Sequence, residues 1–140
     1  MHGWDLSELA VPESAVSVLV TKTYAREHPE VVEAFLKGIA EGALYLKQGQ
    51  NDPAKRARSL QIVADRLKVS EDVVAPELDK IAELARIDLA PDMPSLTEYR
   101  AMVARLTPGV DQIPLDDVID VSFINKLQRE GFFDRIKAGS

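Results

Sequence analysis

Hydrophobic residues recur at helical spacing along most of this chain. Over residues 29–47 they fall three or four positions apart and form one continuous stripe, made of Val32, Phe35, Leu36, Ile39, Ala43 and Leu46. Pro29 suits the first helical position, where its missing N–H would have had no partner, and Gly49 is placed to end the helix. The pattern predicts a helix over 29–47 with Phe35 at the centre of the core.

The next two stripes predict a pair of shorter helices. Asp52 is placed as an N-cap with Pro53 at the first helical position, and this helix is expected to end near Lys68. A further helix start is marked at residues 70–72, but Pro76 would remove an interior hydrogen bond if that helix ran on smoothly. We therefore expect a short turn there, followed by a new helix over 76–86.

The last third of the chain is predicted to hold two more helical segments. After a proline-containing loop at 87–94, Ser95 and Glu98 form a capping box, in which each side chain satisfies a free N–H at a helix start. Pro108 and Gly109 stop that helix, whose stripe is Tyr99, Met102, Val103 and Leu106. A short turn at 114–118 precedes a closing segment over 120–133, capped by Asp120 and turned at Gly131.

One short segment departs from helical spacing. Residues 15–21 alternate Val16, Val18 and Val20 with Ser17, Leu19 and Thr21, and their β-branched content favours a strand that has neighbours on both sides. The fold class predicted from the residues is therefore mainly α, with one short strand at 15–21. Domain organisation is predicted as a single domain or fragment over 1–140, in which 1–14 is an irregular lead-in.

Composition narrows the range of functions. The chain has 46% hydrophobic and 29% charged residues, as in an ordinary soluble globule, and its net charge is -6. This charge repels phosphate backbones, so no nucleic acid is expected as a partner. No apolar run approaches the ~20 residues that span a bilayer, and the start of the chain lacks the basic and apolar regions of a secretory signal.

Candidate chemistry is sparse, and we expect no enzyme, no metal and no cofactor. The chain has no cysteine and two histidines. His28 with Glu30 and Glu33 lacks any recognised metal-ligand spacing. The carboxylates of Asp116, Asp117 and Asp120 suit helix capping better than calcium binding or acid–base work. The basic cluster Lys55, Arg56 and Arg58 has no aromatic residues interleaved and is interpreted as a solvated helix face.

Two further features leave alternatives open. Gly38 and Gly42 form a GxxxG pattern, but Lys37 and Glu41 lie among them, so close packing of another backbone is expected rather than a membrane dimer. Trp4 is the only tryptophan. It is the one weak candidate for a ligand contact, and a hydrophobic plug against the first helix is the commoner use of such a residue.

Several segments together resemble a known family. A return strand, a helical turn carrying Tyr24 and a helix opened by Pro29 resemble the crossover of periplasmic substrate-binding proteins of ABC importers, in the nitrate/sulfonate/taurine and thiamine-pyrimidine group. Residues 28–37, with His28-Pro29-Glu30, are similar to the start of that helix in the family. Residues 120–133, with Gly131-Phe132-Phe133, resemble its closing helix.

The resemblance implies that the chain corresponds to the C-terminal part of a two-lobed α/β (type II) protein. It implies that residues 1–14 end the second lobe and hinge, and that 15–140 return to the first lobe. The implied function is binding and delivery of a small solute to a membrane permease, in the periplasm or another extracytoplasmic location, together with the missing lobes. The alternative is a self-standing helical interaction or dimerisation module, with a homodimer formed through the exposed strand or other apolar surface.

Overall fold

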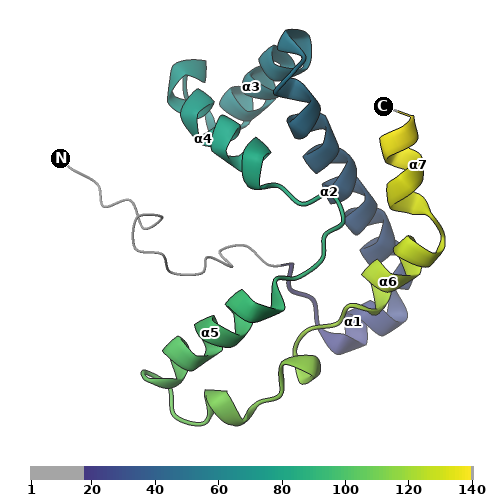
Figure 1. The fold of residues 1–140 in the computed structure, drawn as a ribbon, viewed down its shortest axis with the longest axis vertical. Coiled ribbons are helices and arrows are strands. Elements are labelled where there is room, and N and C mark those ends of the chain that lie inside the picture. The colour runs from purple at the N-terminus through teal and green to yellow at the C-terminus, as the bar shows by residue number, and fades with distance from the viewer. Residues whose placement is uncertain (1–17, 140) are drawn as a thin grey trace. The chain divides into compact units, whose positions relative to one another are not determined.

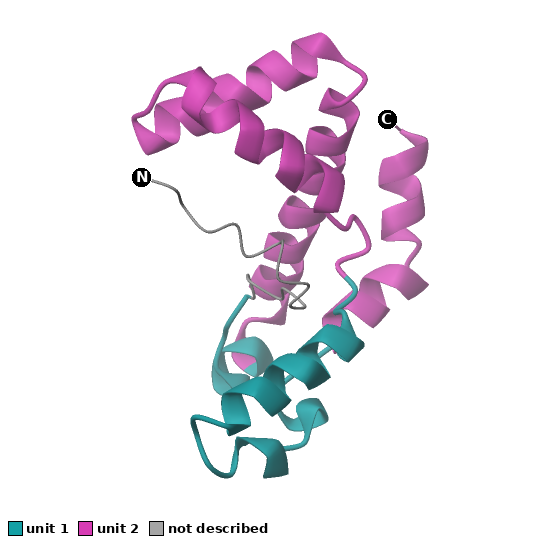
Figure 2. Cartoon of the chain, turned by 60° about the vertical axis from the view of Figure 1, so that its left-hand side comes forward, with its two compact units in different colours: residues 1–26, 90–121 teal, residues 27–89, 122–140 magenta. Residues whose placement is uncertain are grey.

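The computed structural model describes residues 18–139 and forms two compact units. Unit 1 comprises residues 1–26 and 90–121, and unit 2 comprises residues 27–89 and 122–140 (Figure 2). All regular elements of the described residues are helical (Figure 1), namely α1 (Lys22–Glu27), α2 (Pro29–Gly49), α3 (Pro53–Leu67), α4 (Glu71–Leu84), α5 (Met93–Ala104), η2 (Val110–Gln112), η3 (Leu115–Asp117), α6 (Ser122–Arg129) and α7 (Phe132–Ala138).

The predicted strand at 15–21 is wrong for its described part. Residues 18–21 have no regular secondary structure, and α1 begins directly after them. A strand needs a second strand to pair its backbone N–H and C=O groups, and residues 18–139 contain none. The side chain of Leu19 is 89% exposed. The lead-in at 1–14 and residues 15–17 lie outside the described residues, and the expectation of one domain stays a prediction.

Helices α2 and α3 begin where their caps predict. Pro29 occupies the first turn of α2, and the helix runs through Gly49. The Asp52 carboxylate accepts hydrogen bonds from the backbone N–H groups of Ala54 and Lys55 at 3.0 and 3.2 Å, which satisfies two free donors of α3. Lys68 adopts a left-handed conformation, with φ of 60°, and ends α3. Local sequence therefore determines where α2 begins and where α3 begins and ends.

Helix α4 is continuous over Glu71–Leu84, so the predicted break at Pro76 is wrong. Pro76 lies in the second turn, where its missing N–H costs only the hydrogen bond to the carbonyl of Asp72. The Pro76 ring can clash only with the carbonyl group of Asp72, which lies in the first turn of α4. Val74, Leu78 and Ala82 are buried on one face of α4, and packing of these residues from both sides of the proline holds the helix together.

The predicted capping box of α5 is also wrong, although the helix exists. Asp92 is the N-cap, and its carboxylate accepts hydrogen bonds from the backbone N–H and the hydroxyl of Ser95, at 3.4 and 2.6 Å. Pro94 lies inside the first turn, where no N–H is needed. The N-cap thus lies three residues before the predicted one, and the helix begins at Met93.

The closing segment consists of two helices rather than one. Gly131 has φ of 67° and separates α6 from α7, a conformation that glycine adopts without strain. Phe132 and Phe133 then begin α7, with their rings edge to face and 5.4 Å between centroids. Both are buried. The sequence predicted the glycine turn but not the helix that follows it.

Unit 2 contains two hydrophobic clusters, one on each side of α2. The first joins α2 to α6 and α7 and is built from Ala40, Leu127, Phe132 and Phe133, with Leu36, Leu89, Ile124 and Ile136 packed around it. The second joins α3 and α4, which lie side by side (Figure 1), and includes Leu60, Ala64, Val74 and Leu78, with Leu46 of α2 against it. Lys126 of α6 also donates to the Glu33 carboxylate of α2.

The expected position of Phe35 at the core centre is wrong. Its side chain is 54% exposed, whereas Ala40 is fully buried. Two separate groups of helices cover α2, so its buried surface is wider than one stripe and is centred away from Phe35.

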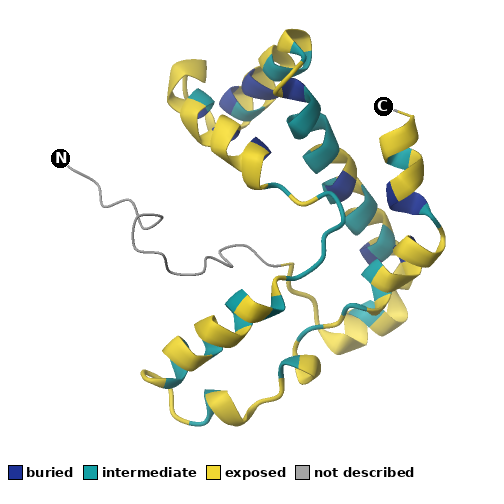
Figure 3. Ribbon diagram, viewed as in Figure 1, coloured by how far each residue is buried: buried dark blue, intermediate teal, exposed yellow. Residues whose placement is uncertain are grey.

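Unit 1 has no core of its own among its described residues. None of residues 18–26 and 90–121 is buried (Figure 3). The predicted stripe of α5 is present but largely uncovered, with Tyr99 and Met102 exposed and Leu106 85% exposed. Arg100 donates to the carbonyl of Ile113 at 2.8 Å and ties α5 to the segment after η2.

Candidate functional site

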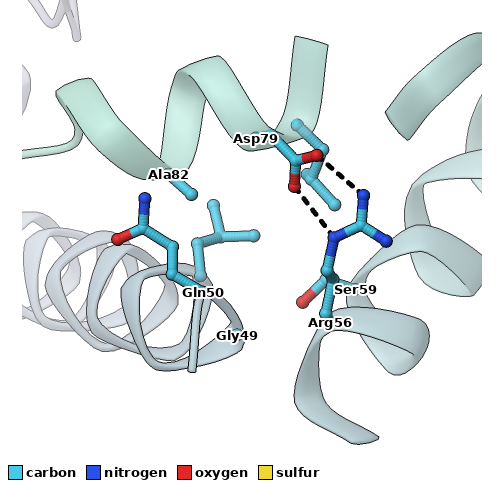
Figure 4. Close-up of a pocket in the computed structure, with 8 residues that line it drawn as sticks. Gly49, Gln50, Arg56, Ser59, Asp79 and Ala82 are labelled. Atoms are coloured by element: carbon cyan, nitrogen blue, oxygen red, sulfur yellow. Dashed lines mark hydrogen bonds and ion pairs between the residues drawn. The ribbon is translucent and has the colours of Figure 1, made fainter. Parts of the chain in front are cut away.

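A small crevice in unit 2 is lined by four polar side chains, those of Gln50, Arg56, Ser59 and Asp79. Arg56 of α3 and Asp79 of α4 point at each other across it (Figure 4). Arg56 Nε donates to Asp79 Oδ1 at 2.9 Å and Nη2 to Oδ2 at 2.7 Å. Gly49 lies beside this pair, and a Cβ there would be 3.3 Å from the backbone N and Cα of Arg56. The sequence missed this pairing because the two residues are 23 positions apart.

The electrostatics of the Arg56–Asp79 pair suit a structural contact between α3 and α4 rather than catalysis. The hydrogen bond from Arg56 lowers the pKa of the Asp79 carboxyl, and the same contact raises the pKa of Arg56. Both groups therefore stay ionised over a wider pH range. A general base works best with a pKa near the operating pH, and Asp79 is shifted the other way. The fork of two parallel bonds fixes α3 against α4.

Ser59 lies at the same crevice, and its hydroxyl oxygen is buried without a hydrogen-bond partner in the protein. The cavity has a volume of about 10 Å³, which is the lower limit for one water molecule. No histidine lines it, and the carboxylate of Asp79 in its wall accepts hydrogen bonds from Arg56. A serine without an available base is a weak nucleophile, and an organic solute is far too large for this space.

A second hollow in unit 2 is an open groove of about 380 Å³. It is lined by Leu44 and Ile136 together with polar groups of Glu41, Tyr45, Gln48 and Lys55. Lys55 donates to the side-chain oxygen of Gln48 at 2.5 Å and lies 5.9 Å from the centroid of the Tyr45 ring. Ligand pockets of small molecules usually enclose most of the ligand, whereas this groove has walls from α2, α3 and α7 only.

The histidine and carboxylates considered for a metal do not form a site. His28 Nδ1 lies 4.0 Å from Glu30 Oε1, and Glu33 is engaged by Lys126. Within residues 18–139 no three His, Cys, Asp or Glu side chains gather as metal ligands would. Asp116 and Asp117 lie in η3. Trp4, the weak ligand candidate, lies outside the described residues.

The basic cluster is divided among separate partners. Lys55 contacts Gln48, Arg56 is paired with Asp79, and Arg58 donates to Gln61 at 2.8 Å. These contacts hold the three side chains within unit 2, so they form no single cationic surface.

The most distinctive surfaces of the described chain are apolar. In unit 1 they include Leu19, Tyr99, Leu106 and Val118, all exposed. In unit 2 they include one face of α2, where Val31 and Phe35 are exposed and a Cβ built at Gly38 or Gly42 meets nothing within 4 Å. The GxxxG spacing of Gly38 and Gly42 predicted that another backbone packs closely against this face of α2. No such backbone lies there among the described residues.

None of the helices in the described range is both long enough and apolar enough to cross a membrane. Comparison with protein families, with curated proteins and with solved structures finds no match for this chain. The candidate surfaces must therefore be interpreted from their own chemistry.

Proposed function

We propose that this chain is the C-terminal segment of an ABC-importer substrate-binding protein, and that it acts in solute binding only together with the missing lobes. The observation that carries the proposal is the lack of a core in unit 1. A stripe such as Tyr99, Met102 and Leu106 is stable only when another surface buries it. The described chain supplies no such surface within unit 1.

The resemblance supports the same proposal from the sequence side. Residues 28–37 and 120–133 are similar to segments of that family. The solute would be a small molecule such as nitrate, a sulfonate or a pyrimidine, the partner a membrane permease, and the location periplasmic or otherwise extracytoplasmic. Because a binding cleft needs walls on both sides to desolvate its ligand, the open groove of unit 2 is not proposed as the solute site.

The genomic sequence upstream of the Met1 codon is the first test. An in-frame coding region there supports the proposal, and an in-frame stop codon close to a promoter contradicts it. The joined protein should then bind one of nitrate, taurine or a pyrimidine in calorimetry, with a dissociation constant of roughly 1 mM or lower, corresponding to about -4 kcal/mol or stronger. The 140-residue chain should bind none of them and catalyse no reaction.

Unit 2 favours a second candidate, a self-standing helical interaction module. Its two buried clusters give α2, α3, α4, α6 and α7 a core without contributions from other chains. A self-standing module should bury its apolar surface in solution, so it should not enhance the fluorescence of an apolar dye. Strong dye binding by the folded chain contradicts this second candidate and agrees with a segment that awaits its missing part.

A further inference from the structure

Ser59 on α3 carries a polar group whose hydrogen bonding is incomplete. Among the described residues, its hydroxyl oxygen is the only buried side-chain nitrogen or oxygen without a hydrogen-bond partner in the protein. A serine inside a helix often donates to the carbonyl four residues earlier, here that of Lys55, but Ser59 makes no such bond. Because a hydroxyl that is buried dry and unpaired costs free energy, a partner for Ser59 is expected.

The crevice that Ser59 lines sets the size of this partner. Its volume of about 10 Å³ matches the space that one water molecule needs and excludes anything larger. Part of its wall is apolar and offers no hydrogen bond, namely Leu46, Leu78 and Ala82. Any hydrogen bonds to a bound molecule must therefore come from the polar part of the wall.

The charges in the polar wall favour a neutral molecule. Arg56 and Asp79 face each other at the crevice (Figure 4), so a cation there would lie beside the guanidinium group and an anion beside the carboxylate. Each Asp79 oxygen accepts one bond from Arg56, and a carboxylate has about four acceptor sites in all. Asp79 can therefore accept a further hydrogen bond. A neutral molecule of this size that both donates and accepts hydrogen bonds is water.

We propose that one water molecule binds in this crevice and joins the Ser59 hydroxyl of α3 to the Asp79 carboxylate of α4. The water accepts the hydrogen of Ser59 and donates one of its own to Asp79. Gln50, which follows α2, lines the same crevice and supplies a third polar group. The bound water thus adds a link between α3 and α4 beside the Arg56–Asp79 ion pair. This inference does not rest on the proposed function, because it concerns the interior of unit 2, whereas the proposed function rests on unit 1.

A crystal structure of the full chain, at a resolution that shows ordered water, tests the site directly. We expect an electron-density peak about 2.8 Å from both Ser59 Oγ and one carboxylate oxygen of Asp79. A crevice without this peak overturns the inference. A hydrogen bond from Ser59 to the Lys55 carbonyl also overturns it, since the hydroxyl then needs no water.

Urea unfolding of Ser59→Ala gives a test in solution. The variant loses a satisfied hydrogen bond and leaves the water with one partner fewer, so its urea midpoint should be lower than that of the unmodified chain. The opposite result is expected if the hydroxyl is buried dry, because alanine then removes an unpaired polar group. A raised midpoint therefore overturns the inference.

Double variants distinguish a water shared with Asp79 from a bond within α3. Asp79→Ala removes the second partner of the water, so in this background the decrease in midpoint caused by Ser59→Ala should shrink by about half or more. Gln61→Ala is the matched control, because it removes an exposed side chain of α3 that is bonded to Arg58. In the Gln61→Ala background the decrease should be unchanged. An equal decrease in all three backgrounds overturns the inference.

Discussion

Phe35 and Phe133 show how differently two phenylalanines of one unit contribute to stability. Phe133 is 1% exposed in the cluster of α2, α6 and α7, whereas more than half of Phe35 is exposed. Phe133→Ala should therefore lower the free energy of unfolding by about 3–5 kcal/mol through lost burial and a residual cavity. Phe35→Ala should cost less than about 1 kcal/mol in the monomer. Urea unfolding at low protein concentration measures both, and equal midpoints would contradict this burial pattern.

Gly49 and Gly38 make a second matched pair within α2. A methyl group at Gly49 would meet the backbone of Arg56 at 3.3 Å, and backbone moves less readily than a side chain. Gly49→Ala should therefore destabilise unit 2 by pushing α3 away from α2. Gly38→Ala meets no such obstacle and should stabilise the monomer by roughly 0.5–1 kcal/mol through higher helix propensity. Thermal unfolding of dilute samples distinguishes the two, and the same sign for both variants would contradict the close approach at Gly49.

At the level of elements, the ion pair between α3 and α4 should make the stability of the fold depend on pH in the acid range. The pKa of Asp79 is lowered in the folded chain by its hydrogen bond to Arg56. A group with a lowered folded pKa stabilises the fold above its unfolded pKa, and this contribution is lost as pH falls through the folded pKa. Stability should therefore decrease below about pH 3.9, the ordinary value for an aspartate.

Variants of the pair identify the source of this pH dependence. Asp79→Asn and Arg56→Gln should each flatten the decrease in urea midpoint below that pH, and the double variant should flatten it no further. A residual slope is expected from Asp72, whose pKa is lowered by a hydrogen bond from Ser70. An unchanged slope in Asp79→Asn would show that the ion pair does not form in solution.

At the level of the whole molecule, the two units should differ in local stability. Unit 2 has two buried clusters, whereas no described residue of unit 1 is buried. Amide protons of α5 should exchange with solvent close to the rate of an unfolded peptide, and those of α2 should be strongly protected, because local opening is cheap where few apolar contacts are lost. Hydrogen exchange followed by mass spectrometry measures both helices in one sample. Equal protection of α5 and α2 would indicate that unit 1 is already covered in the isolated chain.

The sequence alone determined most of the helices, because their signals are local. Pro29, Asp52 and Gly131 act within one turn of the backbone, so the starts of α2 and α3 and the turn after α6 were predicted from neighbouring residues. The expectations about chemistry also came from the sequence alone. The chain lacks cysteine and has no recognised spacing of metal ligands, and from this we expected no metal site.

Tertiary structure decided what depends on distant partners. The segment at 18–21 has strand-forming residues but no strand beside it within residues 18–139, and α4 continues through Pro76 because Val74 and Leu78 pack on both sides of the proline. The buried side of α2 was predicted from a single stripe. Its actual position follows from contacts with α3, α4, α6 and α7, which are far away in the sequence. Periodicity shows that a helix has an apolar face, whereas only the packing of other helices determines how much of that face is covered.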